Sequence, residues 1–466
     1  VSRELRMPEL RPKAVLVAVR LPEVSEAEFD SSRAELRRLV TTLGYDVTAE
    51  VTQVRPALSP AAVLGEGKLL ELAELTGGSG RNETTAPKRK DKARLRRLAE
   101  AEAEDAEDEP ELSSDEAGAR HDGEAAADAP QLIAVDHDIS PSQLRNLERA
   151  TGVSVLDRTG VIIEIFHRHA KSREARLEVE IARLTYTAPR LRESPRGKER
   201  QQGRGAGEAA IELDRRKIRD RIAELREQLE AIQREQAVRR AQRREARRVA
   251  LVGYTNAGKS SWMRALTGSA VLVENKLFAT LDTTIRALQP ETRPRILISD
   301  TVGFIKKLPH DLVASFRSTL DEALQATLLL HIVDASDPDW ESQLEVTSSV
   351  LADIGAQGVP SRVVMNKVDL VSDAERTLLE DRFPDAWFVS TKSADDVARL
   401  HAQIVETFES SYREVELLVP YDRQRLVSEM HENGRVLGQQ YEEAGVRVRW
   451  LTDSLTIDRL QAALTA

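Results

Sequence analysis

The feature that most limits what this chain can fold into is a glycine-bounded loop at residues 253–260. The loop reads Gly-Tyr-Thr-Asn-Ala-Gly-Lys-Ser, fits the pattern G-x-x-x-x-G-K-[ST], and follows an apolar run at residues 249–252. Its glycines let successive N–H groups converge on an anion, and the start of a following helix adds partial positive charge. In such a loop Lys259 reaches the β and γ phosphates, and Ser260 ligates Mg²⁺. The pattern predicts a buried strand, a phosphate loop and a helix that begins near Lys259; a plain glycine turn is the alternative.

Two downstream segments are typical of the parts of a nucleotide switch that sense the γ phosphate. Residues 278–282 read Phe-Ala-Thr-Leu-Asp, and in this polar loop Thr280 can close the Mg²⁺ shell. Residues 300–303 read Asp-Thr-Val-Gly at the end of an apolar strand. Asp300 would hold Mg²⁺ through water, and the Gly303 N–H would contact the γ phosphate.

Two further segments predict how the base is recognised. Residues 366–369 read Asn-Lys-Val-Asp, and Asp369 can accept both N–H donors on the guanine edge. Asn366 would brace the loop, and the stem of Lys367 would lie over the ring. Residues 390–392 read Ser-Thr-Lys, and their backbone N–H groups can meet the guanine carbonyl. Because a site that hydrogen-bonds an exocyclic pattern rejects analogues lacking it by ~10⁴ to 10⁵, we expect the base to be guanine.

The residues assigned to this site fall into three groups. Lys259, Thr280 and Gly303 are predicted to be catalytic, and Ser260, Thr280 and Asp300 are predicted to bind the metal. The predicted nucleotide contacts are Gly253, Tyr254, Thr255, Asn256, Ala257, Gly258, Lys259, Ser260, Phe278, Ala279, Thr280, Leu281, Asp282, Asp300, Thr301, Val302, Gly303, Asn366, Lys367, Asp369, Ser390, Thr391 and Lys392. The order of these segments favours a Mg²⁺-dependent GTP hydrolase that binds GTP and GDP.

One position departs from the pattern of signalling GTPases. Phe304 stands where Ras-type enzymes have the glutamine that orients the attacking water. A phenyl ring cannot make that hydrogen bond, and a group supplied in trans accelerates hydrolysis ~10³- to 10⁵-fold in other GTPases. We expect slow intrinsic turnover and a partner that completes the site; another residue acting in cis is the alternative.

Length and composition narrow the setting. The chain has 466 residues, too many for one core, and no cysteine, which excludes disulfides and thiol chemistry and agrees with a reducing compartment. It begins Val-Ser-Arg-Glu without an apolar signal core, and runs such as residues 328–333 are shorter than the ~20 residues of a membrane span. We expect a cytoplasmic monomer without membrane contact.

The net charge of −10 is concentrated in one segment. Residues 100–128 hold 13 acidic residues against one Arg, a balance of −12, so the remainder of the chain carries +2. A nucleic-acid partner is therefore compatible with the acidic isoelectric point.

Residues 1–160 are predicted to form an α/β domain, with strands at 13–19 and 45–52 around an amphipathic helix at 25–43. Residues 75–130 interrupt it with glycines, a basic block and the acidic run. Because few apolar side chains are present there, we expect a disordered insertion, either a solvated linker or a regulatory arm.

Another glycine-containing turn precedes a helix within this domain. Residues 64–68 read Leu-Gly-Glu-Gly-Lys. We interpret them as a tight turn ahead of a helix, with a second nucleotide site as the alternative. The α/β pattern resumes with a strand at residues 132–136 and a helix at 141–151.

Residues 161–247 are predicted to form an antiparallel helical hairpin, because apolar residues recur at helical spacing on both arms. The seam residues are Leu177, Ile181, Leu184 and Ala188 on one arm and Ile218, Ile222, Leu225, Leu229 and Ile232 on the other. The tip loop at residues 190–207 is basic and glycine-containing. Its predicted RNA contacts are Arg190, Arg192, Arg196, Lys198, Arg200 and Arg204. Aromatic residues make up only 4% of the chain and do not interleave with these charges, so contact would be to phosphate and shape, as in folded RNA. A merely solvated surface is the alternative.

The remaining residues are predicted to form two domains. Residues 248–411 contain the phosphate loop and the switch segments, and residues 412–466 read as a small α/β domain with two strands around Gly445. The predicted fold class is α/β multidomain: an N-terminal α/β domain with a helical hairpin, a P-loop GTPase domain and a C-terminal α/β domain.

Several stretches resemble the HflX family of bacterial ribosome-associated GTPases, over nearly the whole chain apart from residues 75–130. They are residues 64–70, 140–141, 145–148, 157–159, 163–166 and 212–216, the phosphate loop, Phe-Ala-Thr-Leu-Asp and Asp-Thr-Val-Gly-Phe. One departure is Gly207-Glu208-Ala209, where the family has Gly-Glu-Thr. The resemblance implies a factor that binds the 50S large subunit and its 23S rRNA and places the tip near the peptidyl-transferase region.

The resemblance also implies an activity. Members split or rescue stalled or stressed 70S ribosomes, with hydrolysis stimulated by the ribosome, and in some lineages contribute to antibiotic tolerance. A ribosome-assembly checkpoint that binds the rRNA of immature large subunits is the alternative hypothesis. A general nucleotide hydrolase with the hairpin as scaffold is a third.

Overall fold

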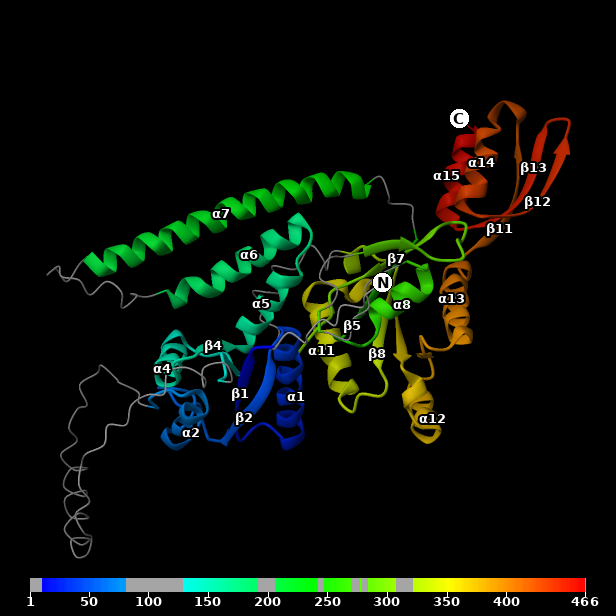
Figure 1. The fold of residues 1–466 in the computed structure, drawn as a ribbon. Coiled ribbons are helices and arrows are strands. Elements are labelled where there is room, and N and C mark those ends of the chain that lie inside the picture. The colour runs from blue at the N-terminus through cyan, green and yellow to red at the C-terminus, as the bar shows by residue number, and fades with distance from the viewer. Residues whose placement is uncertain are drawn as a thin grey trace, which may run out of the picture. The chain divides into compact units, whose positions relative to one another are not determined.

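The computed structural model describes residues 11–80, 129–191, 206–241, 247–269, 277–278, 284–306 and 322–465. The chain divides into two compact units, Val1–Val161 and Ile162–Ala466 (Figure 1). The strands within these described ranges form three sheets. The predicted α/β multidomain class is confirmed. None of the helices within the described ranges is long and apolar enough to cross a membrane.

The N-terminal unit is built on a parallel sheet of order β2-β1-β3-β4. Its strands are β1 (Lys13–Arg20), β2 (Asp46–Val54), β3 (Leu132–Val135) and β4 (Ser154–Asp157), and its helices are α1 (Glu26–Thr42), α2 (Glu66–Thr76) and α4 (Pro141–Thr151). Strand β1 is buried along most of its length, as its continuous apolar run predicts for a central parallel strand. Ser25 caps α1, and Ser140 forms a capping box with Gln143 at the start of α4.

Helix α2 changes one predicted boundary. It continues to Thr76, and Gly77 ends it in the left-handed conformation with φ 74°. The ordered domain therefore extends past residue 75, where the insertion was predicted to begin. Residues 81–128 of that insertion lie outside the described part of the chain.

A buried ion network connects α1 with the carboxyl ends of β3 and β4. Arg158 donates a 2.7 Å hydrogen bond to Asp136 and also pairs with Glu35. Ser32 donates to the second oxygen of Asp136 at 2.6 Å. One guanidinium serves both carboxylates in this dry environment, so removing Arg158 would leave two buried charges uncompensated.

The hairpin contains α6 (Arg173–Thr187) and α7 (Ala206–Ala241), preceded by α5 (Arg158–His169). The helical pattern predicted from residue 161 to 187 is interrupted at residues 170–172, where Ser172 caps α6. Helices α6 and α7 lie side by side (Figure 1), with Leu177, Ile181 and Leu225 buried between them. Leu184, Ile222, Leu229 and Ile232 pack around this cluster, so most of the predicted seam is confirmed.

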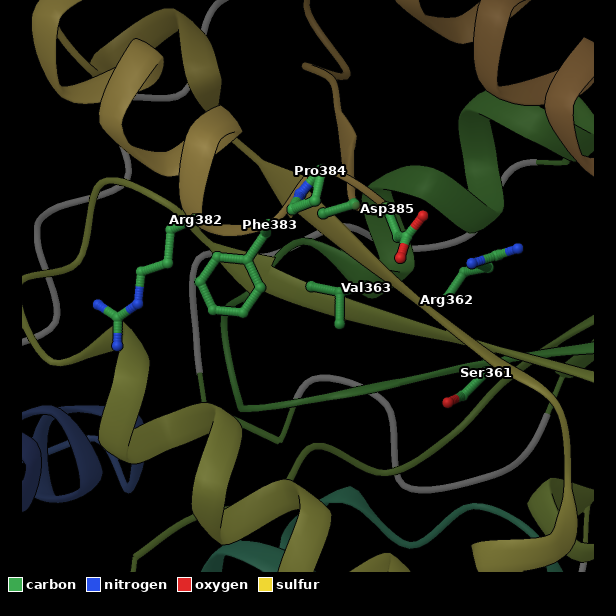
Figure 2. A pocket seen from close by; sticks show the side chains of 8 residues that line it. Ser361, Arg362, Val363, Arg382, Phe383, Pro384 and Asp385 are labelled. Carbon is green, nitrogen blue, oxygen red and sulfur yellow. The ribbon is translucent and has the colours of Figure 1, made fainter.

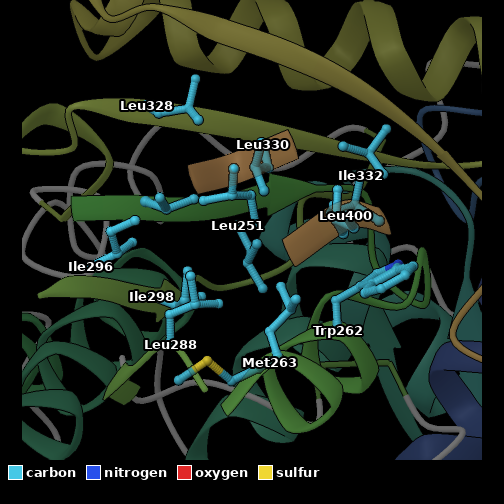
Figure 3. Packing of buried hydrophobic residues seen from close by; sticks show 14 of the residues in the cluster. Leu251, Trp262, Met263, Leu288, Ile296, Ile298, Leu328, Leu330, Ile332 and Leu400 are labelled. Atoms are coloured by element: carbon cyan, nitrogen blue, oxygen red, sulfur yellow. The ribbon is translucent and has the colours of Figure 1, made fainter. Parts of the chain in front are cut away.

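The central sheet has the order β10-β9-β8-β5-β7-β6, and only β6 is antiparallel to its neighbour. Its elements are β5 (Arg247–Gly253), α8 (Lys259–Thr267), β6 (Thr284–Ala287), β7 (Ile296–Asp300), β8 (Leu328–Asp334), α11 (Trp340–Asp353), β9 (Ser361–Asn366), α12 (Asp373–Arg382), β10 (Trp387–Phe388) and α13 (Ala394–Glu409). On one face Trp262 and Met263 of α8 share a core with Leu251, Ile298 and Leu400 (Figure 3). This core fixes α8, and with it the phosphate loop, against the sheet.

The C-terminal sheet is antiparallel, with the order β11-β13-β12. Its elements are β11 (Arg413–Val419), α14 (Arg425–Asn433), β12 (Arg435–Glu442), β13 (Gly445–Thr452) and α15 (Ser454–Thr465). Val448 and Trp450 of the middle strand pack with Met430 of α14 and Leu460 of α15. Arg247 at the start of β5 forms an ion pair with Asp453, which connects this sheet to the strand that carries the phosphate loop.

Candidate nucleotide-binding site

The phosphate loop lies between β5 and α8, at the carboxyl end of the central strands. Its two glycines are required because a side chain would clash with neighbouring atoms and because their φ angles are positive. Gly253 has φ 148°, and a Cβ there would lie 2.2 Å from the carbonyl oxygen of Ile332 on β8. Gly258 has φ 102°, and a Cβ there would lie 2.2 Å from Nδ2 of Asn366. No other residue type fits either position without moving the backbone of a neighbouring strand or its polar side chain.

Lys259 is buried inside the loop. Its Nζ donates to the carbonyls of Gly253 at 3.0 Å and Tyr254 at 2.7 Å. Burial lowers the pKa of Lys259 to about 8, and the charge of Asp300 opposes that shift. The ammonium is therefore held in a poorly solvated position where an anion would be its strongest partner.

Ser260 at the start of α8 and Asp300 at the end of β7, two residues of the predicted metal site, lie in contact. The Ser260 hydroxyl donates to Oδ2 of Asp300 at 2.7 Å, and Asp300 is fully buried at the end of β7. A hydroxyl and a carboxylate are the hard oxygen donors that Mg²⁺ prefers, so these residues fit that ion. Bound beside the phosphates, Mg²⁺ supplies neutralisation of charge on the transferred group. Thr280, the third predicted metal residue, lies outside the described residues.

Asn366 ties the base-recognition segment to the phosphate loop. Its Nδ2 donates to the carbonyl of Ala257 at 2.7 Å, while its Oδ1 is buried without a hydrogen-bond partner among the described residues. Lys367 follows in the left-handed conformation with φ 61°, and its Nζ pairs with Asp334 at 2.5 Å. The hydrogen bond from Asn366 to Ala257 is consistent with the bracing role predicted for Asn366. The ion pair with Asp334 fixes the end of the Lys367 side chain.

Asp369 has both carboxylate oxygens occupied by side chains. Lys392 donates to Oδ2 at 2.8 Å and Ser390 donates to Oδ1 at 2.6 Å. The hydrogen bonds from Lys392 and then Ser390 lower the pKa of Asp369 below its ordinary value. The carboxylate is thus held ionised, the state that accepts two N–H donors from a base.

The segment at residues 390–392 differs from the expectation in its backbone. The Ser390 N–H donates to Asp396 at 2.8 Å, and the Lys392 N–H donates to Ser390 Oγ at 3.2 Å. Both groups were expected to meet the guanine carbonyl, but they stabilise the loop itself. Of the three N–H groups predicted to donate to the guanine carbonyl, the one we still expect to do so is that of Thr391.

Three residues that the motifs did not single out contribute to this region. Asp334 anchors Lys367, and Asp396 holds the Ser390 loop. His331 is buried on β8, and burial, followed by the charge of Lys259, lowers its pKa to about 4. It therefore stays neutral near the lysine. His331 and Asp334 could have been noticed as polar residues in the apolar run of β8, whereas Asp396 follows a polar stretch and carries no such signal.

Part of the predicted site falls outside the described residues. This part comprises Ala279, Thr280, Leu281, Asp282, Arg192, Arg196, Lys198, Arg200 and Arg204. Phe278 is described and is buried, with its ring 4.6 Å from that of Phe166 in an edge-to-face contact. Arg190 stacks its guanidinium 3.5 Å from the Tyr186 ring and donates to the Tyr186 carbonyl, so it is anchored to α6.

A pocket of about 250 Å³ lies at the start of β9 (Figure 2). Asn366 is at the other end of that strand. Residues at the start of β9 and the end of α12 line it, among them Val363 and Phe383. It contains no residue of the phosphate loop or of the base-recognition segment. Since ligands of parallel sheets bind outside the carboxyl ends of the strands, this pocket is not the nucleotide site.

The phosphate loop, the paired Ser260 and Asp300 and the Asn366–Ala257 contact together define a P-loop GTPase. A GTPase HflX from Gluconacetobacter diazotrophicus is 58% identical to this chain over 457 residues, which is 98% of each chain. The chain belongs to the HflX family of GTPases, as the sequence resemblance predicted, and it binds GTP and GDP and hydrolyses GTP with Mg²⁺ as cofactor.

Three family models and a second relative agree with this assignment. Three family models match: "GTP-binding GTPase N-terminal" at residues 30–84 and 120–167, "GTP-binding GTPase Middle Region" at 169–243, and "50S ribosome-binding GTPase" at 248–367. GTPase HflX of Caldanaerobacter subterraneus subsp. tengcongensis is 34% identical and covers 94% of this chain and 90% of its own. The crystal structure of a GTP-binding protein from Sulfolobus solfataricus in complex with GDP is 21% identical, covers 84% of this chain and 99% of its own, and has a TM-score of 0.43.

Proposed function

We propose that the GTP-bound protein binds the large ribosomal subunit through its 23S rRNA, splits or rescues stalled 70S ribosomes in the cytoplasm, and leaves after hydrolysis. The observation that supports this most directly is the helical hairpin. Helix α7 has 36 residues, whereas its partner α6 has 15. At 1.5 Å per residue α7 spans roughly 54 Å, so the pair forms a long support for the basic loop between its arms.

Apolar and charged contacts hold the two arms of the hairpin together. Leu177, Ile181 and Leu225 form its buried seam, and Arg221 donates to Glu180 across it at 3.0 Å. A rigid support reduces the ordering entropy that binding would otherwise cost. A basic loop on such a support is suited to a polyanion, and the name of the family model that matches residues 248–367 points to the 50S subunit.

Nucleotide control would come from the switch segments. The γ phosphate binds the N–H of Gly303 and the loop around Thr280 only in the GTP state. A ligand shifts a conformational equilibrium by its differential affinity for the two states, so GTP can favour the ribosome-binding state and GDP its release.

Gradient sedimentation of 70S ribosomes with the protein and a non-hydrolysable GTP analogue tests the proposal. We expect the 70S peak to be replaced by free subunits, with the protein on the large one. A persistent 70S peak together with binding to free or immature large subunits would instead favour an assembly checkpoint. Lys259→Ala, which should not bind nucleotide, is the control for dependence on GTP.

A second arm of the experiment tests the tip. Replacing Arg192, Arg196 and Arg200 with alanine should weaken binding to large subunits and flatten its salt dependence, because each lost phosphate contact lowers the salt slope by roughly one unit. The matched control is Arg216→Ala with Arg226→Ala, two exposed positions on α7. Equal binding of both variants at all salt concentrations would remove the tip from the proposal. GTP affinity should not change in either variant.

Tolerance of ribosome-targeting antibiotics is a further expectation, to be measured in cells lacking the protein.

A further inference from the structure

The segment that follows Asp300 lies directly on the phosphate loop. The Thr255 N–H donates to the Phe304 carbonyl at 2.8 Å, and the Phe304 N–H donates to the Gly253 carbonyl at 3.2 Å. These two bonds form an isolated parallel bridge between Tyr254 and Phe304. Residues 301–306 therefore continue beyond β7 as a short edge attached to the phosphate loop. We call residues 301–306 the switch edge.

The Tyr254 side chain adds a third bond to this attachment. Its hydroxyl accepts the N–H of Lys306 at 2.7 Å. The Lys306 ammonium lies 3.5 Å from Asp339, at the start of α11. Phe304 and Ile305 are both buried, with 2% and 0% of their surface exposed. The switch edge is thus held by backbone bonds, by one tyrosine hydroxyl and by two buried side chains.

Gly303 occupies the position where the γ-phosphate ligands meet. A Cβ at Gly303 would lie 2.8 Å from Cγ2 of Thr255 and 3.0 Å from Nζ of Lys259. The Gly303 backbone therefore rests against the same ammonium that a γ phosphate would bind. The N–H of Thr255, within the phosphate loop, is bonded to Phe304.

Lys259 and the switch edge also share one acceptor. The Gly253 carbonyl accepts from Lys259 Nζ at 3.0 Å as well as from the Phe304 N–H. A γ phosphate that draws Lys259 away and inserts beside Gly303 would change both contacts at once. The α and β phosphates lie over the loop N–H groups nearer the start of α8. Their binding therefore does not require the switch edge to move.

We propose that the Tyr254 hydroxyl is a latch that holds the switch edge closed on the phosphate loop, and that GTP, but not GDP, must open it. Tyr254 is then a residue that determines how strongly the site discriminates between the two nucleotides. This inference rests on the GTP and GDP binding of the family, not on the ribosomal function proposed above.

The variant Tyr254→Phe removes the hydroxyl and keeps the ring. Because a net hydrogen bond is worth a factor of about five in an equilibrium, we expect affinity for a non-hydrolysable GTP analogue to rise about fivefold relative to affinity for GDP. Isothermal titration of both nucleotides measures the ratio. The matched control is Tyr421→Phe, whose hydroxyl donates to the Glu442 carbonyl at 2.8 Å in the C-terminal sheet; its ratio should equal that of the unmodified protein. An unchanged or lower ratio in Tyr254→Phe would overturn the proposal.

Hydrogen exchange at the Lys306 amide provides a readout that does not depend on nucleotide affinity. In the nucleotide-free protein we expect this amide to be protected, and to exchange several times faster in Tyr254→Phe but not in Tyr421→Phe. Adding the GTP analogue to the unmodified protein should accelerate exchange there, whereas GDP should not. If the GTP analogue protects the amide further, the closed edge is the GTP-bound state and the latch does not exist.

Discussion

At the scale of single residues, Lys259 shows how the protein prepares a site before the ligand arrives. Its ammonium is buried between two carbonyls of its own loop, where it loses hydration, and the charge of Asp300 offsets that loss only in part. His331 nearby is kept neutral, chiefly by burial, and so adds no positive charge of its own beside the lysine. A polyphosphate would restore the full electrostatic stabilisation of the lysine.

The lowered pKa of Lys259 predicts how GTP affinity depends on pH. The free protein holds this lysine charged below about pH 8 and increasingly neutral above it. The bound phosphates require the charged form. GTP affinity should therefore fall by up to tenfold per pH unit above about 8.

Lys259→Arg is the matched control for this measurement. Arginine stays charged throughout the same range, so the variant should not show the additional fall. Deprotonation of the guanine base at high pH affects both proteins equally. Parallel curves for the two proteins, measured by titration between pH 7 and pH 10, would contradict the role assigned to the lysine.

Asp369 provides a second residue-level prediction. In Asp369→Asn an amide replaces the carboxylate that accepts two guanine donors, and we expect GTP affinity to fall ~10²- to 10⁴-fold while xanthosine triphosphate binds better than GTP. Competition binding with both nucleotides gives the ratio. Asp381→Asn, on the exposed side of α12, is the control and should bind like the unmodified protein. Retained preference for guanine in Asp369→Asn would remove Asp369 from base recognition.

At the scale of elements, the spacing of apolar residues was sufficient to predict those helices and strands whose pattern repeats over a few residues. The apolar run before the phosphate loop became β5, and the helical spacing of the seam residues became the α6–α7 contact. Strand β1 and the capping box of α4 follow from the same kind of local pattern. These features depend on neighbours within a few residues, which is why the sequence alone could predict them.

Contacts between distant segments were not predictable in the same way. The Arg158 pairs reach residues 123 and 22 positions away, and the Lys306–Tyr254 bond spans 52. Periodicity in the sequence does not reveal such partners, because it is the topology of the fold that brings these distant residues together. The backbone N–H groups at Ser390 and Lys392 were assigned to the base for the same reason, since their internal partners could not be read from spacing. The domain boundaries at residues 160, 247 and 411 stay a prediction, as do the individual nucleotide contacts.

The hairpin seam gives a prediction at the element scale. Leu225 is fully buried between α6 and α7, so Leu225→Ala should destabilise the hairpin by ~2–4 kcal/mol. Hydrogen exchange in both helices should accelerate, while exchange in the central sheet should not change. Leu213→Ala on the same helix is the control, because Leu213 is 54% exposed. Similar exchange in the two variants would mean that the seam does not hold the arms together.

At the scale of the whole molecule, the switch edge does not offer an aqueous group where other GTPases place their glutamine. Phe304 is 2% exposed, and its backbone is bonded to the phosphate loop. We therefore expect hydrolysis to depend on a group that comes from elsewhere, with the proposed ribosomal partner as its source; another residue acting in cis is the alternative. In that case the protein would hydrolyse GTP at a useful rate only on the ribosome.

Turnover measurements test this dependence. We expect slow hydrolysis by the protein alone and acceleration of ~10³-fold by large ribosomal subunits, the range in which a missing catalytic group acts in trans. Phosphate release is the readout, and subunits incubated with Lys259→Ala give the background from contaminating GTPases. Turnover that is as fast without ribosomes as with them would show that the site is complete in cis and that the hairpin is only scaffold.

The hydrogen bond from Asn366 to Ala257 has a consequence for any attempt to redesign this enzyme. Asn366 begins the segment that reads the base, yet it also fills the space that a side chain at residue 258 would need. An engineer who wanted a different base could alter Asp369 and leave the grip on the phosphates untouched. Altering Asn366 would also weaken phosphate binding. Base preference can therefore be changed at Asp369 but not at Asn366.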